Sequence, residues 1–218
     1  MTEGFETSAD VLTQAECERL IVELKGAARS RAGARHLMSN AAVGAIAQDQ
    51  RLVSIARAAL GTRAMPFRAT LSEKTGAKNW LIAWHQDTAL PLRVRFNAPG
   101  WGPWSEKHGI LYAHAPGWAL DRVVALRVHL DESTAENGPL RVVPKSHRAG
   151  VLSDKEVLDV AGRQDSVECP VPLGGVLAMK PLLIHSSSKC SSNEPRRVLH
   201  IEYADSLEFA PGIELAVA

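Results

Sequence analysis

The sequence is poor in cysteine and carries almost no net charge, and each shortage excludes a class of protein. The three cysteines, Cys17, Cys169 and Cys190, are widely spaced and form no Cys-x-x-Cys pair. A disulfide framework is therefore not expected, and a reducing, cytoplasmic location is predicted. With 25 Lys and Arg against 24 Asp and Glu, the net charge is +1. The protein therefore has no overall positive electrostatic field that would predict binding to nucleic acid or to an anionic membrane.

Long hydrophobic runs are missing as well, so no membrane-spanning segment is expected. The first ten residues, MTEGFETSAD, are acidic and polar and do not resemble a secretory signal. Hydrophobic residues make up 45% and charged residues 22% of the sequence, which is typical of a globular protein. Because no repeat or linker interrupts the chain, we expect one domain over residues 1–218. Its oligomeric state is left open.

Residues 1–64 are expected to be mainly helical. Thr13 and Glu16 form a capping-box pattern ahead of apolar residues at helical spacing, and a second helix is predicted over Asp49–Leu60. A later capping box, Ser153 with Glu156, predicts one more helix in the second part of the chain.

Residues 65–205 are expected to form a β-rich core, because short apolar runs alternate there with Gly, Pro, Asn and Asp. The predicted strands are Phe67–Ser72, Trp80–His85, Gly109–His114, Val123–Leu130, Leu140–Val143, Gly175–Met179, Leu182–His185 and Val198–Tyr203. Helices followed by short strands indicate an α+β fold with a β-sandwich or barrel.

The histidines carry the clearest chemical signal. Two His-x-Asp triplets, His85 with Asp87 and His129 with Asp131, each lie at the end of a predicted strand, and His185 ends another. Residues i and i+2 of a strand point to the same side, so the His and Asp of a triplet are expected to bind one metal. Two imidazoles and one carboxylate with open coordination positions are typical of a mononuclear non-haem Fe(II) oxygenase. Asp131 also opens a polar turn, which favours a structural interpretation of the second triplet.

The surroundings of the first triplet resemble the phytanoyl-CoA dioxygenase-like family. The segments that carry this resemblance are Trp84–Asp87, Asn137–Leu140, Pro144–His147, His185–Ser187 and Pro195–Arg197. It covers roughly residues 67–203 and implies a double-stranded β-helix (a jelly-roll, cupin-like core) with the N-terminal helices packed on one sheet. It also implies an Fe(II)- and 2-oxoglutarate-dependent oxygenase. Two positions depart from the family pattern, because Lys145 and Ser186 stand where many relatives have Gly.

The resemblance assigns roles to individual residues. It makes His85, Asp87 and His185 the iron ligands. It makes Arg196, eleven residues after His185, the partner of the distal carboxylate of 2-oxoglutarate. Arg197 stays open as the alternative, although it would point to the other face of a strand.

Three further residues are candidates for contact with the cosubstrate. Ser187 and Gln86 occupy positions where the family has a Ser and a Gln. Arg127 lies on a strand that is expected to cross the pocket, and a buried Arg needs an anion. Exposure of Arg127 to solvent is the alternative.

The predicted function is therefore hydroxylation of a small organic substrate with O2. Asp87 favours hydroxylation over halogenation, because related halogenases lack this carboxylate. A cupin-type metalloenzyme that does not use 2-oxoglutarate and a catalytically silent ligand-binding jelly roll remain as alternatives. Arg93, Arg95 and Arg127 hint at a substrate with an anionic part. The Trp-rich segment 97–118 is either a wall of the pocket or a structural flap.

Overall fold

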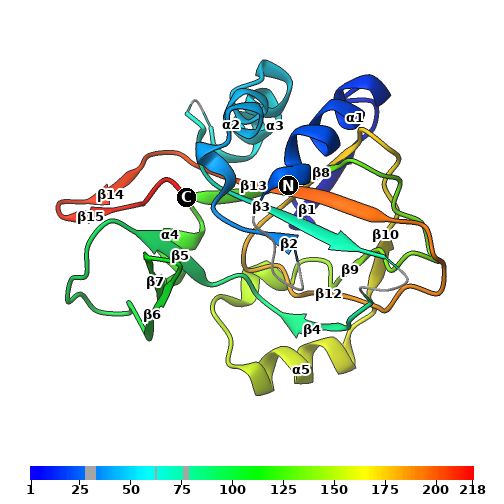
Figure 1. Ribbon diagram of the computed structural model, residues 1–218. Helices are drawn as coiled ribbons and strands as arrows, with labels where there is room; N and C mark the ends of the chain where they lie inside the picture. Colours follow the sequence, from blue (N-terminus) through cyan, green and yellow to red (C-terminus); the bar gives the residue numbers. More distant parts are fainter. Residues whose placement is uncertain (28–32, 62, 76–78) are drawn as a thin grey trace.

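Two facing antiparallel sheets form the centre of the molecule (Figure 1). The computed structural model describes residues 1–27, 33–61, 63–75 and 79–218. The larger sheet has the order β1-β11-β8-β13-β3-β2 and the smaller has the order β10-β9-β12-β4. The larger sheet consists of β1 (Phe5–Ser8), β11 (Val176–Met179), β8 (Val123–His129), β13 (Arg196–Ala204), β3 (Met65–Lys74) and β2 (Gly33–Ala34). The smaller consists of β10 (Val167–Cys169), β9 (Leu140–Val142), β12 (His185–Ser187) and β4 (Ile82–His85).

Smaller elements lie around this pair of sheets. A three-stranded sheet joins β5 (Ala89–Leu92), β7 (Ile110–His114) and β6 (Trp104–Lys107), and a hairpin joins β14 (Glu208–Ala210) and β15 (Ile213–Glu214). The α-helices are α1 (Gln14–Glu23), α2 (Ala41–Ala47), α3 (Gln50–Leu60), α4 (Gly117–Leu120) and α5 (Asp154–Arg163). Short 3-10 turns span Leu24–Gly26, Leu37–Ser39 and Ser146–Ala149. The α+β jelly-roll fold expected from the sequence is confirmed.

The larger sheet separates a hydrophobic layer from a polar interior. On β13, Leu199, Ile201 and Tyr203 belong to the core shared with the N-terminal helices, whereas the alternate residues Arg196 and His200 line a cavity on the opposite side. This is the two-residue alternation of a strand. The sequence therefore builds one face of the sheet for packing and the other for a ligand.

The N-terminal helices pack on the larger sheet, as predicted, and lie above it in Figure 1. The predicted capping boxes begin α1 at Thr13 and α5 at Ser153, and Asp49 caps α3. The hydroxyl of Tyr203 donates a hydrogen bond to the Ala47 carbonyl at 2.9 Å, which ties α2 to β13.

Several predicted boundaries are wrong. A strand was expected over Leu182–His185, but β12 begins at His185. The apolar residues before it are buried in a turn, where the Leu183 amide donates to the Lys180 carbonyl, so burial without strand pairing produced the strand-like pattern. β1 and β2 lie within the segment expected to be mainly helical, and β5, β6 and β10 were not predicted.

No helix in the described parts of the chain is long and apolar enough to cross a membrane. The single-domain boundary at residues 1–218 and the cytoplasmic location stay predictions.

Candidate metal centre and cosubstrate pocket

A cavity of about 480 Å³ is lined by residues of both sheets and of the three-stranded sheet. Its polar lining is strongly cationic. Among the described residues, six basic side chains line it, namely Arg35, Arg68, Lys74, Lys107, Arg127 and Arg196, against one carboxylate, Asp87. A cavity of this volume is typical of a small-molecule site.

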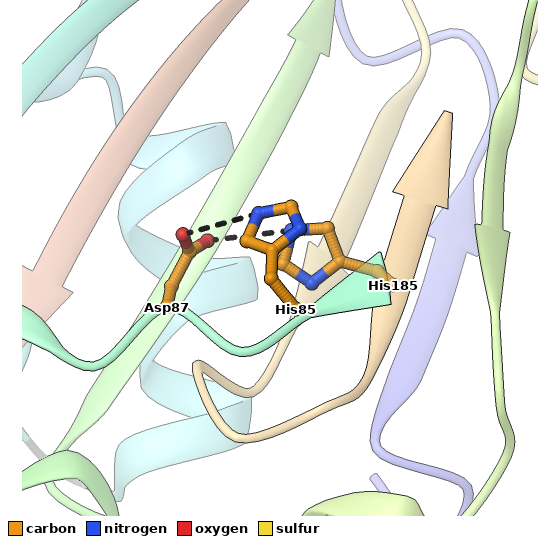
Figure 2. A group of neighbouring side chains, drawn as sticks. All are labelled: His85, Asp87 and His185. Carbon is orange, nitrogen blue, oxygen red and sulfur yellow. Dashed lines mark ion pairs between the residues drawn. The ribbon is translucent and has the colours of Figure 1, made fainter. Parts of the chain in front are cut away.

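His85, Asp87 and His185 meet at the wall of this cavity, as predicted (Figure 2). His85 and His185 are direct partners in the pairing of β4 with β12. The Nε2 atoms of His85 and His185 lie 3.8 Å and 3.6 Å from the two carboxylate oxygens of Asp87. Two donors that share a metal at about 2.0–2.2 Å are at most about 4.4 Å apart. The three side chains therefore form a candidate metal site.

The position of Asp87 differs from the expected geometry. The sequence pattern suggested that His85 and Asp87 point the same way along one strand, but β4 ends at His85. The Asp87 amide donates to the Pro181 carbonyl at 2.9 Å. This bond fixes the loop after β4, so the carboxylate reaches the imidazoles through a turn rather than through the pleat of a strand.

Hydrogen bonds leave both imidazoles ready to bind a metal through Nε2. The Nδ1 atoms of His85 and His185 lie 2.8 Å and 2.9 Å from the carbonyls of Ala83 and Leu183. A carbonyl only accepts, so Nδ1 carries the proton and the lone pair is on Nε2.

Electrostatics favour the protonation states that a metal requires. Burial, opposed by the charge of Asp87, lowers the pKa of His185 to about 4, so this imidazole is neutral near pH 7. Burial also works against the Asp87 carboxylate, but the histidines around it, with His185 first, hold its pKa well below the usual range. The site therefore offers a carboxylate and a neutral imidazole at neutral pH.

The second His-x-Asp triplet does not form a metal site. His129 is buried, and neither of its ring nitrogens has a hydrogen-bond partner among the described residues. Asp131 instead accepts two hydrogen bonds from the Arg197 side chain at 2.7 Å each and one from the Arg197 amide at 2.8 Å. The structural interpretation of this triplet agrees with the geometry.

A cluster of buried cations lies in the same cavity as the triad, and we call Lys74, Arg127 and Arg196 the inner cations. Each is at most 9% exposed, and no carboxylate in the described residues pairs with any of them. Within the described ranges, the Arg196 guanidinium donates hydrogen bonds to the Asn137 carbonyl at 3.2 Å and to the Ser187 hydroxyl at 3.3 Å, and its Nη1 has no hydrogen-bond partner. Burial, and then the charge of Arg127, lower the pKa of Arg196 to about 10. Burying a cation without a counter-ion raises the free energy of the folded state, and a bound anion would offset this cost.

Ser187 lies at the centre of the inner cations. Its hydroxyl accepts from Lys74 Nζ at 2.7 Å and from Arg196, and it donates to the Gly138 carbonyl at 2.8 Å. Ser187 is two residues beyond His185 on β12. This strand therefore connects the metal triad to the inner cations.

The comparison with known proteins agrees with this arrangement. A family model described as phytanoyl-CoA dioxygenase (PhyH) matches residues 3–198. The chain belongs to the PhyH family. The resemblance found in the sequence is thus confirmed, and because the match begins at residue 3 it also includes the N-terminal helices.

Individual relatives of this PhyH chain are distant. It is 26% identical to L-proline trans-4-hydroxylase of Streptomyces griseoviridis over 178 residues, which cover 70% of this chain but only 59% of that enzyme. AviO1 from Streptomyces viridochromogenes superposes with a TM-score of 0.65 and 24% identity, over 94% of this chain and 90% of AviO1. EctD from S. alaskensis, solved with 2-oxoglutarate and 5-hydroxyectoine, superposes with a TM-score of 0.69 and 21% identity, over 93% of this chain and 72% of EctD. At these identities the structural likenesses establish the fold.

Gln86 lines the cavity, and its contact with the cosubstrate stays a prediction. Its amide nitrogen donates to the carbonyls of Gly150 and Leu182, and its amide oxygen accepts from the Leu152 amide. Both ends of the side chain are thus engaged with the backbone, and Gln86 connects the loops that carry these partners.

Lys74 is the main residue that sequence reasoning missed. It is 1% exposed, and its Nζ contacts Ser187 and the Ser188 carbonyl. The sequence offers one weak signal for Lys74, because this residue ends a strand in which the buried residues Ala69 and Leu71 alternate with polar ones. A Lys at the end of a strand is ordinarily exposed, however, so the pattern did not indicate a buried site. Its partners, the Ser187 hydroxyl and the Ser188 carbonyl, are 113 and 114 positions away in the chain, so the sequence does not show that the buried ammonium group is hydrogen-bonded.

The Trp-rich segment has both of the roles considered for it. Trp101 and Trp104 pack with Phe96 in a hydrophobic cluster and do not line the cavity, whereas Lys107 and Tyr112 do. The segment also contains β6, β7 and α4 and is not a loop.

Two of the arginines expected at the substrate site lie elsewhere. Arg93 pairs with Glu214 at the surface, and Arg95 stacks over Trp104. Neither lines the cavity, whereas Arg127 does.

Proposed function

We propose that this protein is an Fe(II)- and 2-oxoglutarate-dependent dioxygenase that hydroxylates a small organic substrate. One atom of O2 enters succinate as 2-oxoglutarate loses CO2, and the other enters the substrate as a hydroxyl group. The observation that supports this proposal most directly is the adjacency of two features in one cavity. A His-Asp-His triad with free donor atoms lies beside buried cations that have no anionic partner in the part of the chain that the structure describes.

Each part of the cavity has a task in this proposal. His85, Asp87 and His185 hold the iron, which supplies redox chemistry with O2 when it is bound. Arg196 binds the distal carboxylate of 2-oxoglutarate through its guanidinium, which has no anionic partner among the described residues, because Arg can form a two-point contact with a carboxylate. Ser187 orients that guanidinium, and Lys74 and Arg127 add positive charge around it. The walls of the cavity restrict water at the reacting atoms.

Arg197 is unsuited to the cosubstrate, because Asp131 already neutralises it through a two-point contact. Asp87 as the third ligand supports hydroxylation rather than halogenation.

The test compares the wild type with His85→Ala, Asp87→Ala and His129→Ala. Iron binding is measured by anaerobic dialysis and succinate by mass spectrometry after addition of 2-oxoglutarate and O2. We expect the first two variants to lose both iron and succinate formation, and His129→Ala to retain iron if circular dichroism shows that it is folded. Iron binding without succinate would favour the cupin-type alternative. Failure of the wild type to bind iron would favour a silent jelly roll.

A further inference from the structure

A second group of positive charges lies at the exposed rim of the cavity, apart from the inner cations. Arg35 is exposed and Lys107 is partly exposed, and both line the cavity. No carboxylate in the described ranges pairs with either of them. We call Arg35 and Lys107 the rim cations.

Two aromatic rings, those of Tyr112 and His36, lie beside the rim cations. Lys107 Nζ lies 4.8 Å from the centre of the Tyr112 ring, and Tyr112 is 3% exposed. His36 Nε2 lies 2.9 Å from the Tyr112 hydroxyl, and the two rings stack with centroids 6.0 Å apart. Tyr112 therefore joins the segment after β2, which carries Arg35, to strand β7, so that both parts of the rim are fixed relative to one another.

The third basic residue near the rim is already neutralised. Arg68 donates to Glu202 Oε1 at 2.7 Å and to the Ala89 carbonyl at 2.9 Å. Glu202 is itself 2% exposed, so it compensates Arg68 beneath the cavity surface and does not reach the rim. Arg35 and Lys107 are consequently the uncompensated cations of the rim among the residues that the structure describes.

The positive charges around Lys107 repel its ammonium group. Burial lowers the pKa of Lys107, and the charges of Arg35 and Arg68 lower it further. An anion at the rim would relieve this repulsion and gain charge-assisted hydrogen bonds.

We propose that Arg35 and Lys107 bind an anionic group of the substrate, a carboxylate or a phosphate, and thereby place its carbon skeleton between the rim and the metal triad. This inference rests on the proposed function. In this arrangement 2-oxoglutarate binds to the inner cations and takes up part of the same cavity of about 480 Å³. The remaining space limits the substrate to a small organic anion with an aliphatic part.

The experiment measures binding rather than turnover. The protein is loaded with Zn(II) and saturating 2-oxoglutarate, so that the inner cations are occupied. Compounds are then titrated in matched pairs by calorimetry: linear and cyclic four- to six-carbon carboxylates against their carboxamides, and alkyl phosphates against the parent alcohols. The double variant Arg35→Gln/Lys107→Gln is compared with Lys155→Gln/Arg163→Gln, which removes the same charge from exposed positions on α5.

We expect one anionic series to bind the wild type and the α5 variant, and to bind the rim variant at least about tenfold more weakly, the effect of one lost charge-assisted contact. The neutral partners should respond equally in all three proteins. The carboxylate and phosphate arms then identify the anion. The inference is overturned if no anion binds the wild type better than its neutral partner, or if the rim variant retains full affinity. The visible charge-transfer band of the anaerobic Fe(II)–2-oxoglutarate protein is recorded in parallel. Its absence counts against the proposed function, whereas its presence without anion selectivity counts against the rim site alone.

Discussion

Replacement of Arg196 and Arg197 should separate cosubstrate binding from stability, although the two residues are neighbours. Arg196 is 2% exposed and has no anionic partner in the described chain, whereas Arg197 forms a two-point ion pair with Asp131. Arg196→Met should therefore weaken 2-oxoglutarate binding, and Arg197→Gln should lower the free energy of unfolding.

The magnitudes follow from the contacts that each variant loses. A charge-assisted hydrogen bond contributes about 1.5–3 kcal/mol, so loss of one such bond at Arg196 raises the Kd for 2-oxoglutarate about tenfold to a hundredfold. Loss of both bonds would raise it further. The unliganded Arg196→Met protein should be no less stable than the wild type, because the change removes a cation repelled by Arg127. Arg197→Gln should cost about 1 kcal/mol, since the pair with Asp131 is partly exposed and screened by solvent.

The assay is an anaerobic titration of 2-oxoglutarate into the Fe(II) protein, with urea unfolding of the same metal-free samples. The reasoning is refuted if Arg197→Gln raises the Kd as much as Arg196→Met. It is also refuted if Arg196→Met binds 2-oxoglutarate with wild-type affinity.

Three further predictions concern other parts of the molecule. Burial, and then Arg196, lower the pKa of Lys74 to about 8, so its cation is present below that pH and is lost above it. Lys74→Met should therefore raise the Kd for 2-oxoglutarate near pH 7, with a difference from the wild type that shrinks by about pH 9.5; a pH-independent difference would contradict this. Trp101→Ala should lower stability by roughly 2–3 kcal/mol in thermal unfolding, less than for a fully buried Trp, and leave succinate formation per folded molecule unchanged. Ser153→Ala should remove the cap of α5 and cost about 1 kcal/mol in urea unfolding, with a loss below 0.3 kcal/mol contradicting the role of the capping box.

The sequence allowed prediction of elements whose signal is local. The capping boxes of α1 and α5 and the apolar runs of β8 and β11 depend on neighbouring residues, and they lie close to the predicted positions. The short strands β1 and β10 were missed because each is stabilised by a distant partner rather than by its own pattern. β1, for example, pairs with β11 across more than half of the chain.

For the candidate site, too, features with a signal in the sequence were predicted, whereas features that depend on distant contacts were not. Residue types and order, through the family resemblance, named His85, Asp87, His185 and Arg196 as candidates, and the structure places all four in one cavity. The backbone contacts of Gln86 could not be predicted, because its hydrogen-bond partners come from two distant loops. The rim cations were missed for a similar reason, since Arg35 meets the β6–β7 region only in the folded chain.

The direct pairing of His85 with His185 has a consequence for how the protein folds. These two residues are separated by 100 positions in the chain, and β12 reaches β4 while also pairing with β9. Neither half of the polypeptide can assemble the triad alone, and closing such a long loop is entropically costly. Metal affinity should therefore develop late in folding, at the step that joins β12 to β4. Because the unfolded chain lacks the assembled triad, a bound metal ion would slow unfolding by holding this closure together.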